Sequence, residues 1–279
     1  MKTILRLATD VPFLSEAAML AILAQVDRLD PLAAEHPRLK ELRESLAPKA
    51  TMEAGGVAVI PVKGILARDP DPMEMAFFGM ESTDALAAEV NRAAKDPAAK
   101  AILLDVDSPG GYLTGGPELA DAVKRAAAAK PVVAWTGGQM ASMAYWVGSQ
   151  ASHVSASRSA TLGSIGVYVA VADRSEMFKA NGVKMEVFKN KEATFKGMGV
   201  PGTALTDDQR DYMKERAQRA FDEFRSEVLS ARVVPPEAMK GQTFSGRESL
   251  ANGLADSVGD RSWALAVARK LARQAARAG

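Results

Sequence analysis

The stretch AILLDVDSPGGYLTGGPELADAVKRAAAAKPVVAWTG, residues 101–137, decides the fold because it holds a strand, a turn, a helix and a second strand. Residues 101–107 form a short apolar run ahead of the turn SPGG, which is typical of a strand buried on both faces. Residues 117–129 carry a helical pattern, and residues 131–137 return to an apolar strand. This order predicts two parallel strands with the helix packed across them.

The same alternation continues on both sides of this stretch. Ahead of it, residues 57–66 (VAVIPVKGIL) read as a buried strand and residues 82–96 as a helix with a Ser or Thr cap. After it, residues 140–151 read as a helix and residues 153–157 as a strand. The chain is therefore predicted to be an α/β protein with a parallel or mixed sheet covered by helices. Farther along, strands are predicted at 164–173 and 183–190, and helices at 206–232 and 262–278.

The N-terminal region, residues 1–54, is predicted to be a charged helical extension. Its apolar run AAMLAILAQV reads as a short helix capped by Ser15, with Glu16 in the first turn, rather than as a secretion signal. No window of the sequence approaches the ~20 apolar residues that span a bilayer. We therefore expect a soluble, cytoplasmic chain with no membrane span.

The composition narrows the possible functions. A net charge of +1 gives no reason to expect a nucleic-acid or acidic-membrane partner. The absence of cysteine excludes disulfides, thiolate metal sites and thiol nucleophiles. Asp105 and Asp107 alternate at the end of their strand, but a lone acidic pair indicates turn and surface chemistry rather than a metal site.

Three glycine-bearing turns carry the candidate chemistry: SPGG at 108–111, TGGQMAS at 136–142 and LGSIG at 162–166. The first two each follow a strand and precede a helix, so both belong on the rim formed by the carboxyl ends of the strands. Consecutive glycines let backbone N–H groups point into a site, as an oxyanion hole requires. Ser142 lies in the first turn of the following helix and is the candidate nucleophile, although the residues alone fit an ordinary helix N-terminal serine equally well.

A serine nucleophile needs a base, and histidine is poorly supplied. The chain has two histidines, His36 in the charged N-terminal region and His153 at the start of a strand, and a structural role is favoured for His153. Lysine is the alternative, provided that its ordinary pKa of about 10.4 falls to about 7–8. Lys196 has Phe195 and Met198 beside it, but the residues alone favour a solvated loop lysine over a catalytic one.

Several ordered motifs together resemble the S49 serine peptidases, the signal peptide peptidase A family with its phage capsid-protease relatives. The resemblance runs from about residue 57 to residue 260. It rests on the order and spacing of VAVIPVKGIL, ILLDVDSPGG, MASMAYW, TLGSIGV, FKGMGVPGTALTDDQR and FSGRESLANGLAD. The SPGG turn alone also occurs in the wider Clp-protease and crotonase-like fold. The resemblance implies that fold, with repeated ββα units, an N-terminal helical segment and C-terminal helices.

The resemblance also implies site residues. The family uses a Ser-Lys dyad, whose nucleophile position is Ser142 and whose lysine is Lys196. A further serine, which orients the lysine, is Ser164. The implied oxyanion donors are the backbone N–H groups of Gly110, Gly111 and Met143. Cellular members usually carry two glycines after the nucleophile, whereas Met143 and Ala144 stand here, so a narrower pocket beside the serine is expected.

The expected function is therefore a serine endopeptidase without cofactor or metal, acting on protein or peptide substrates. The motif LLDVDSPGG and the helical N-terminal region resemble those of the phage-type members. These members are capsid assembly (prohead) proteases that cut scaffold and capsid proteins. Family members form rings in which the lysine can come from a neighbouring subunit, so a homo-oligomer with a shared site is expected. The alternatives are a cellular signal peptide peptidase-like protease, an inactive scaffold or interaction protein on the same fold, and crotonase-like acyl-CoA chemistry. The expected domains are an N-terminal extension at 1–54, a peptidase domain at 55–260 and a C-terminal helix at 261–279.

Overall fold

The computed structural model describes residue 41 and residues 44–278. Predictions for residues 1–40, including the Ser15 cap and His36, therefore lie outside the described residues. The strands are β1 (Thr51–Glu53), β2 (Val57–Ala67), β3 (Met80–Ser82), β4 (Ala101–Gly111), β5 (Val132–Ala141), β6 (His153–Ala156), β7 (Thr161–Gly163), β8 (Thr243–Ser245) and β9 (Ser257–Val258). The helices are α4 (Pro72–Phe78), α5 (Thr83–Lys95), α6 (Gly116–Ala129), α7 (Met143–Ser149), α8 (Ser175–Ala180), α9 (Asp207–Ala231), the 3₁₀ turn η2 (Pro236–Ala238), α10 (Gly246–Ala251) and α11 (Arg261–Ala278).

The strands form one mixed sheet in the order β1-β2-β4-β5-β6-β9. Its central pairs, β2 with β4, β4 with β5 and β5 with β6, are parallel, while β1 pairs antiparallel with β2 and β8 with β7. The predicted α/β class is confirmed. Because β1 pairs with β2, the sheet begins ahead of the domain boundary expected at residue 55.

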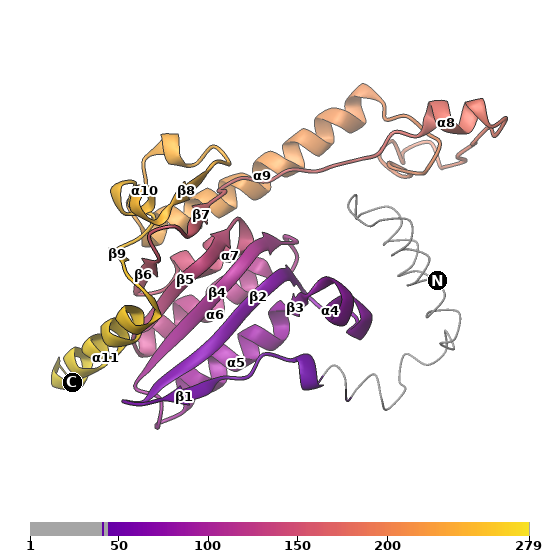
Figure 1. The fold of residues 1–279 in the computed structure, drawn as a ribbon. Coiled ribbons are helices and arrows are strands. Elements are labelled where there is room, and N and C mark those ends of the chain that lie inside the picture. The colour runs from indigo at the N-terminus through magenta and orange to yellow at the C-terminus, as the bar shows by residue number, and fades with distance from the viewer. Residues whose placement is uncertain (1–40, 42–43, 279) are drawn as a thin grey trace.

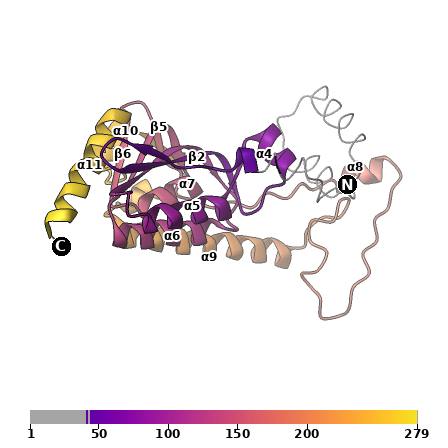
Figure 2. The same cartoon turned by 90° about the horizontal axis from the view of Figure 1, so that it is seen from below.

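Helices cover both faces of the sheet (Figures 1 and 2). On β4, Ile102 and Leu104 point into the larger core, which α5, α6 and α7 also line, whereas Leu103 points into a smaller cluster under α11. All three side chains are 0% exposed. Burial on both faces is the reason that the sequence shows a continuous apolar run here instead of an alternating one.

The long helix α9 begins as predicted, with Thr206 as its cap in a reciprocal arrangement with Gln209. Its C-terminal part packs on the core, where the ring of Phe224 stacks on Trp146 with centroids 4.8 Å apart. Its N-terminal part projects away together with residues 168–205, which we call the arm (Figures 1 and 2).

The strands predicted at 164–173 and 183–190 are absent from the arm as the structure describes it. Val183, Met185 and Val187 alternate with polar residues, but all three are exposed. An isolated strand leaves its backbone groups and its apolar face without partners. The alternating sequence pattern is therefore not sufficient to form a strand within one chain. None of the helices in the described part of the chain combines the length and the apolar character that a membrane span requires.

Candidate active site

Two serines have strained backbone conformations. Ser142 has φ 51° and ψ −125°, and Ser164 has φ 52°. Within the described part of the chain, they are the only non-glycine residues with positive φ. Such conformations cost of order 1–3 kcal/mol each and gather at functional sites. These are the two serines that the sequence selected for the site.

Ser142 is a one-residue connection between the end of β5 and the start of α7. Its N–H donates to Gly163 O at 2.8 Å, and its carbonyl accepts from the N–H groups of Tyr145 and Trp146 at 2.9 and 3.0 Å. Every residue of α7 is buried. The turn is therefore held from both sides and cannot relax without disturbing the core.

Ser164 follows the short strand β7, which pairs in parallel with β5 so that Gly163 lies opposite Ala141. Ser142 and Ser164 therefore leave the sheet side by side at the same rim. The Ser164 N–H donates to Gln242 O at 2.8 Å, which holds the second turn in place. The structure thus places the backbones of two of the three predicted catalytic residues side by side.

The SPGG turn at the end of β4 meets Ser142 at this rim. Gly110 has φ 106°, and a Cβ on it would lie 2.7 Å from Ser142 Cβ and 2.9 Å from Met143 N. Only glycine allows this approach. The Gly110 N–H, predicted as one oxyanion donor, already donates to Ser108 Oγ at 3.1 Å.

Gly111 is better oriented to donate. The next amide, that of Tyr112, donates to Leu66 O on β2 at 2.9 Å. Successive amides of an extended strand point to opposite sides, so the Gly111 N–H points toward the β5 side of β4, where Ser142 lies.

Met143 presents its backbone N–H group, and not its side chain, to the candidate site. As the first residue of α7, its N–H has no acceptor within the helix. Its side chain is only 4% exposed and lies against Gly116, where an added Cβ would come within 1.9 Å of Met143 Sδ. Ala144 is also buried. Both side chains belong to the larger core, and the narrower pocket expected beside the serine stays a prediction.

Lys196 lies on the arm and is exposed. Its neighbours contact the first turns of α9: Thr194 O accepts from Gln209 Nε2 at 3.0 Å, and the ring of Phe195 stacks on Tyr212. Tyr212 is twelve residues before Phe224, about 18 Å along the helix axis. The contacts that this segment makes with α9 thus lie at the far end of the helix from the Trp146 stack. Within the described part of the chain, no hydrogen bond joins Lys196 to Ser142 or Ser164.

His153 is at the wrong end of the sheet to serve Ser142. It pairs with Val133, nine residues before Ser142, and nine residues of strand span roughly 30 Å. Its Nε2 lies 2.8 Å from Ser257 Oγ, and partial burial holds the pKa of His153 below its ordinary value. The structural role favoured from the sequence agrees with this position.

The acidic pair on β4 is also accounted for. Asp105 accepts from Lys63 and Arg261 at 3.2 and 3.0 Å, and Asp107 accepts from the Gln139 N–H at 3.1 Å. Over the described ranges, no group of three or more His, Asp or Glu side chains could hold a metal ion.

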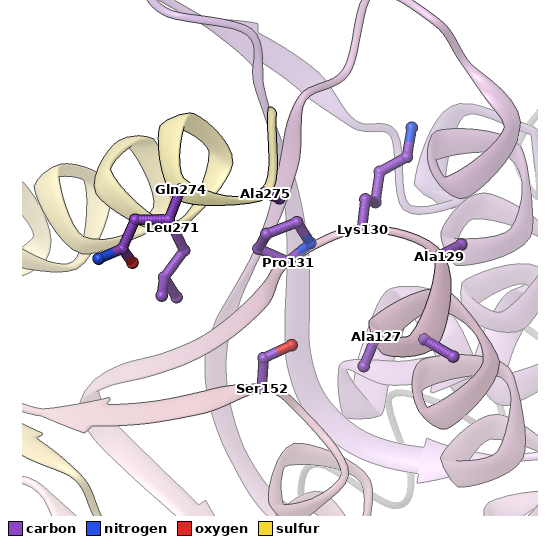
Figure 3. A pocket seen from close by; sticks show the side chains of 9 residues that line it. Ala127, Ala129, Lys130, Pro131, Ser152, Leu271, Gln274 and Ala275 are labelled. Carbon is purple, nitrogen blue, oxygen red and sulfur yellow. The ribbon is translucent and has the colours of Figure 1, made fainter. Parts of the chain in front are cut away.

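A shallow pocket of about 340 Å³ lies elsewhere, lined by Lys130, Pro131, Ser152 and Leu271 among others (Figure 3). Pro131 and Ser152 directly precede β5 and β6, so this pocket is at the opposite end of the strands from Ser142. Lys130 is occupied there, because its ammonium donates to the carbonyls of Ala93, Asp96 and Ala99 near the end of α5. The pocket is therefore not part of the candidate active site.

Sequence reasoning missed two buried polar residues beside the rim. Ser108 is 0% exposed and bonds to Gly64 O and to the Gly110 N–H. Glu81 is 8% exposed and accepts from the Lys63 N–H at 2.5 Å. Both bond to backbone where the β2–β4 ladder changes register. The sequence signal for Ser108 was its place in SPGG, but nothing local distinguishes Glu81.

Residues 124–275, more than half of the chain, match the model of peptidase family S49. The chain belongs to peptidase family S49. Among S49-like relatives, the chain is 31% identical over 219 residues to "Capsid assembly protease C" of Escherichia phage lambda, covering 77% of this chain and 49% of that protein. It is 31% identical over 232 residues to "Protease 4" of Salmonella typhi, covering 81% and 36%.

This S49 chain thus spans half or less of the length of these two curated relatives. Among solved structures, an enoyl-CoA hydratase/isomerase family member is similar at 14% identity, with a TM-score of 0.42 and coverage of 81% of this chain and 75% of that one.

Proposed function

We propose that this protein is a serine endopeptidase that works by acyl transfer with a Ser142–Lys196 dyad. The observation that carries the proposal is the strained conformation of Ser142, which lies against Gly110. The N–H group of the next residue, Gly111, points toward the same side of β4 as Ser142. A positive-φ serine between a strand and a helix presents its hydroxyl at the rim, as a nucleophile requires.

The proposed reaction uses backbone donors and one amine. Ser142 Oγ attacks the peptide carbonyl carbon and forms the Oγ–C bond, while its proton passes to neutral Lys196 Nζ. The N–H groups of Gly111 and Met143 stabilise the oxyanion. The C–N bond then breaks as Lys196 returns the proton to the leaving amine, and water hydrolyses the acyl-enzyme by the same route. Ser164 is proposed to orient the Lys196 amine.

The position of Lys196 on the arm favours a site completed between subunits. The arm exposes Tyr168 and Phe188 at 88% and 90%, together with the alternating residues Val183, Met185 and Val187. A second copy that covers these side chains would remove Lys196 from water, and a dry environment favours the neutral amine. We therefore propose a homo-oligomer in which the lysine acts on the serine of a neighbouring subunit.

The proposed substrates are proteins of a phage capsid assembly reaction, such as scaffold and capsid proteins, cut in the bacterial cytoplasm. Support comes from the similarity to the capsid assembly protease of phage lambda. A cellular signal peptide peptidase-like role is the second candidate, supported by the similarity to Protease 4.

Labelling with a fluorophosphonate probe tests the chemistry. The wild type is expected to be labelled at Ser142, and Ser142→Ala and Lys196→Ala are each expected to lose more than 99% of labelling and of casein cleavage. An equimolar mixture of the two inactive variants, refolded together, is expected to regain part of the activity, because some interfaces pair an intact serine with an intact lysine. Full activity of Lys196→Ala would overturn the dyad, and no labelling of the wild type would favour an inactive interaction protein.

A further inference from the structure

We propose that the Ser108 hydroxyl is a positioning residue, which holds the Gly110–Gly111 turn so that the Gly111 amide is aimed at a carbonyl bound at Ser142. This inference rests on the proposed peptidase function. Ser108 does not touch the reacting atoms itself, because it acts through the backbone of the turn.

The hydroxyl connects two backbone groups from different strands. Ser108 is 0% exposed, and its Oγ lies 2.6 Å from Gly64 O on β2 and 3.5 Å from Gly110 O. A serine hydroxyl has one proton, which the shorter contact to Gly64 O takes. A lone pair is then left to accept the Gly110 N–H at 3.1 Å.

The place of Ser108 in the sheet explains the need for this bridge. The β2–β4 ladder shifts register between Lys63 and Ile65, and the β4–β5 ladder shifts between Val106 and Ser108. A register shift leaves backbone groups without ladder partners. Ser108 lies at both irregularities and provides a partner for a carbonyl on one strand and an amide on another.

The consequence falls on the next amide along the chain. The peptide unit after Gly110 carries the Gly111 N–H, so the conformation of Gly110 sets the direction of that donor. Gly110 already lies against Ser142 and Met143, where an added Cβ would come within 3 Å of either residue. Without the Ser108 hydroxyl, the Gly110 N–H loses its partner and the turn can rotate. An interaction that strengthens only as the oxyanion forms affects kcat more than KM.

Ser155 provides a matched control. It is also 0% exposed, and its hydroxyl accepts from Ser257 Oγ at 3.1 Å where β6 pairs with β9, away from the rim. Ser155→Ala therefore removes a buried, bonded hydroxyl of the same size without changing the glycine turn.

The experiment compares Ser108→Ala with Ser155→Ala in the full-length protein. It measures kcat and KM on a fluorogenic peptide whose sequence is chosen from casein cleavage products. The concentration of active sites is titrated with fluorophosphonate, and kcat is given per active site. The Ki of a peptide aldehyde of the same sequence is measured as well. For Ser108→Ala we expect kcat to fall ten- to a hundredfold and the aldehyde Ki to rise in proportion, with KM within twofold. Ser155→Ala is expected to match the wild type in all three.

Unchanged kcat and Ki in Ser108→Ala would overturn the proposal, as would an equal loss in Ser155→Ala. If Ser108→Ala does not fold, Ser108→Cys keeps the shape with a weaker donor and acceptor. It is expected to lose part of kcat, and a wild-type kcat there would also overturn the proposal. Ser142→Ala distinguishes failure of the proposed function from failure of the positioning role. If Ser142→Ala keeps peptidase activity, the proposed function is wrong. If Ser142→Ala is inactive while Ser108→Ala has wild-type kcat and Ki, only the positioning role of Ser108 is wrong.

Discussion

At the scale of single residues, the site depends on backbone positions rather than on unusual side chains. Ser142 has a conformation that L-residues avoid, and the buried helix α7 together with the bond to Gly163 O holds it there. Gly110 allows Ser142 to lie this close to β4, because any side chain at position 110 would collide with Ser142. Strain of this kind persists only where the surroundings determine it more strongly than the local backbone does.

Glu81 predicts a pH dependence of stability. Burial raises its pKa to about 7 from 4.5, against the opposing effects of the Lys63 N–H and of the Lys63 charge. The folded chain thus holds this proton more tightly than the unfolded chain, so the free energy of unfolding falls as pH rises from about 4.5 to about 7. Glu81→Gln keeps an acceptor for Lys63 but cannot ionise, and it is expected to be about 1–3 kcal/mol more stable than the wild type at pH 8.

Urea unfolding at pH 5 and pH 8 measures this difference. Glu118→Gln is the control, because Glu118 is an exposed partner of Arg68 and its loss should change little at either pH. If the wild type and Glu81→Gln change equally between the two pH values, Glu81 is not the group responsible.

At the scale of elements, α9 has two different ends. Its C-terminal part is anchored by Phe224, which is 2% exposed and stacks on Trp146, one turn after Ser142. Its N-terminal part carries the stack of Tyr212 on Phe195, which is 44% exposed. One helix therefore links the core beneath Ser142 to the arm that bears Lys196.

This asymmetry predicts different costs for two aromatic truncations. Phe224→Ala is expected to lower the free energy of unfolding by about 3–5 kcal/mol, because it leaves a cavity against Trp146. Phe195→Ala is expected to cost no more than about 0.5–1 kcal/mol in the monomer, because Phe195 remains 44% exposed even when it is stacked on Tyr212. Denaturant unfolding in dilute protein gives both values, and a similar cost for the two would contradict the assignment of α9 to a buried and an exposed end.

At the scale of the whole molecule, the arm exposes several large apolar side chains. Tyr168 and Phe188 are almost fully exposed, and residues 183–190 pair with no other strand among the described residues. A surface of this kind marks an interaction site. A second copy of the arm or of the sheet rim would give both the backbone and the apolar face a partner.

Sedimentation velocity tests this assembly. The wild type is expected to sediment as an oligomer, and the double variant Tyr168→Ser, Phe188→Ser is expected to shift to the monomer and to lose at least 90% of casein cleavage. Val233→Ser is the control, because Val233 is 93% exposed but lies beyond the C-terminal end of α9, away from the arm. A monomeric wild type with full activity would contradict a site shared between subunits.

The α/β class, the parallel central strands and the caps of the helices followed from local patterns, since apolar periodicity and cap residues act over a few neighbours. Ser142 could be selected because its glycine turn, short helix and motif order are contiguous features. The prediction of strands at 164–173 and 183–190 is wrong for the single chain. Hydrophobic periodicity indicates which face of a strand would be apolar, but not whether another strand is present to pair with it. Only the tertiary structure placed Ser164 beside Ser142, engaged the Gly110 amide with Ser108 and put Lys196 on an exposed arm. Those outcomes depend on strand register and on burial between segments far apart in the chain, which no local pattern encodes.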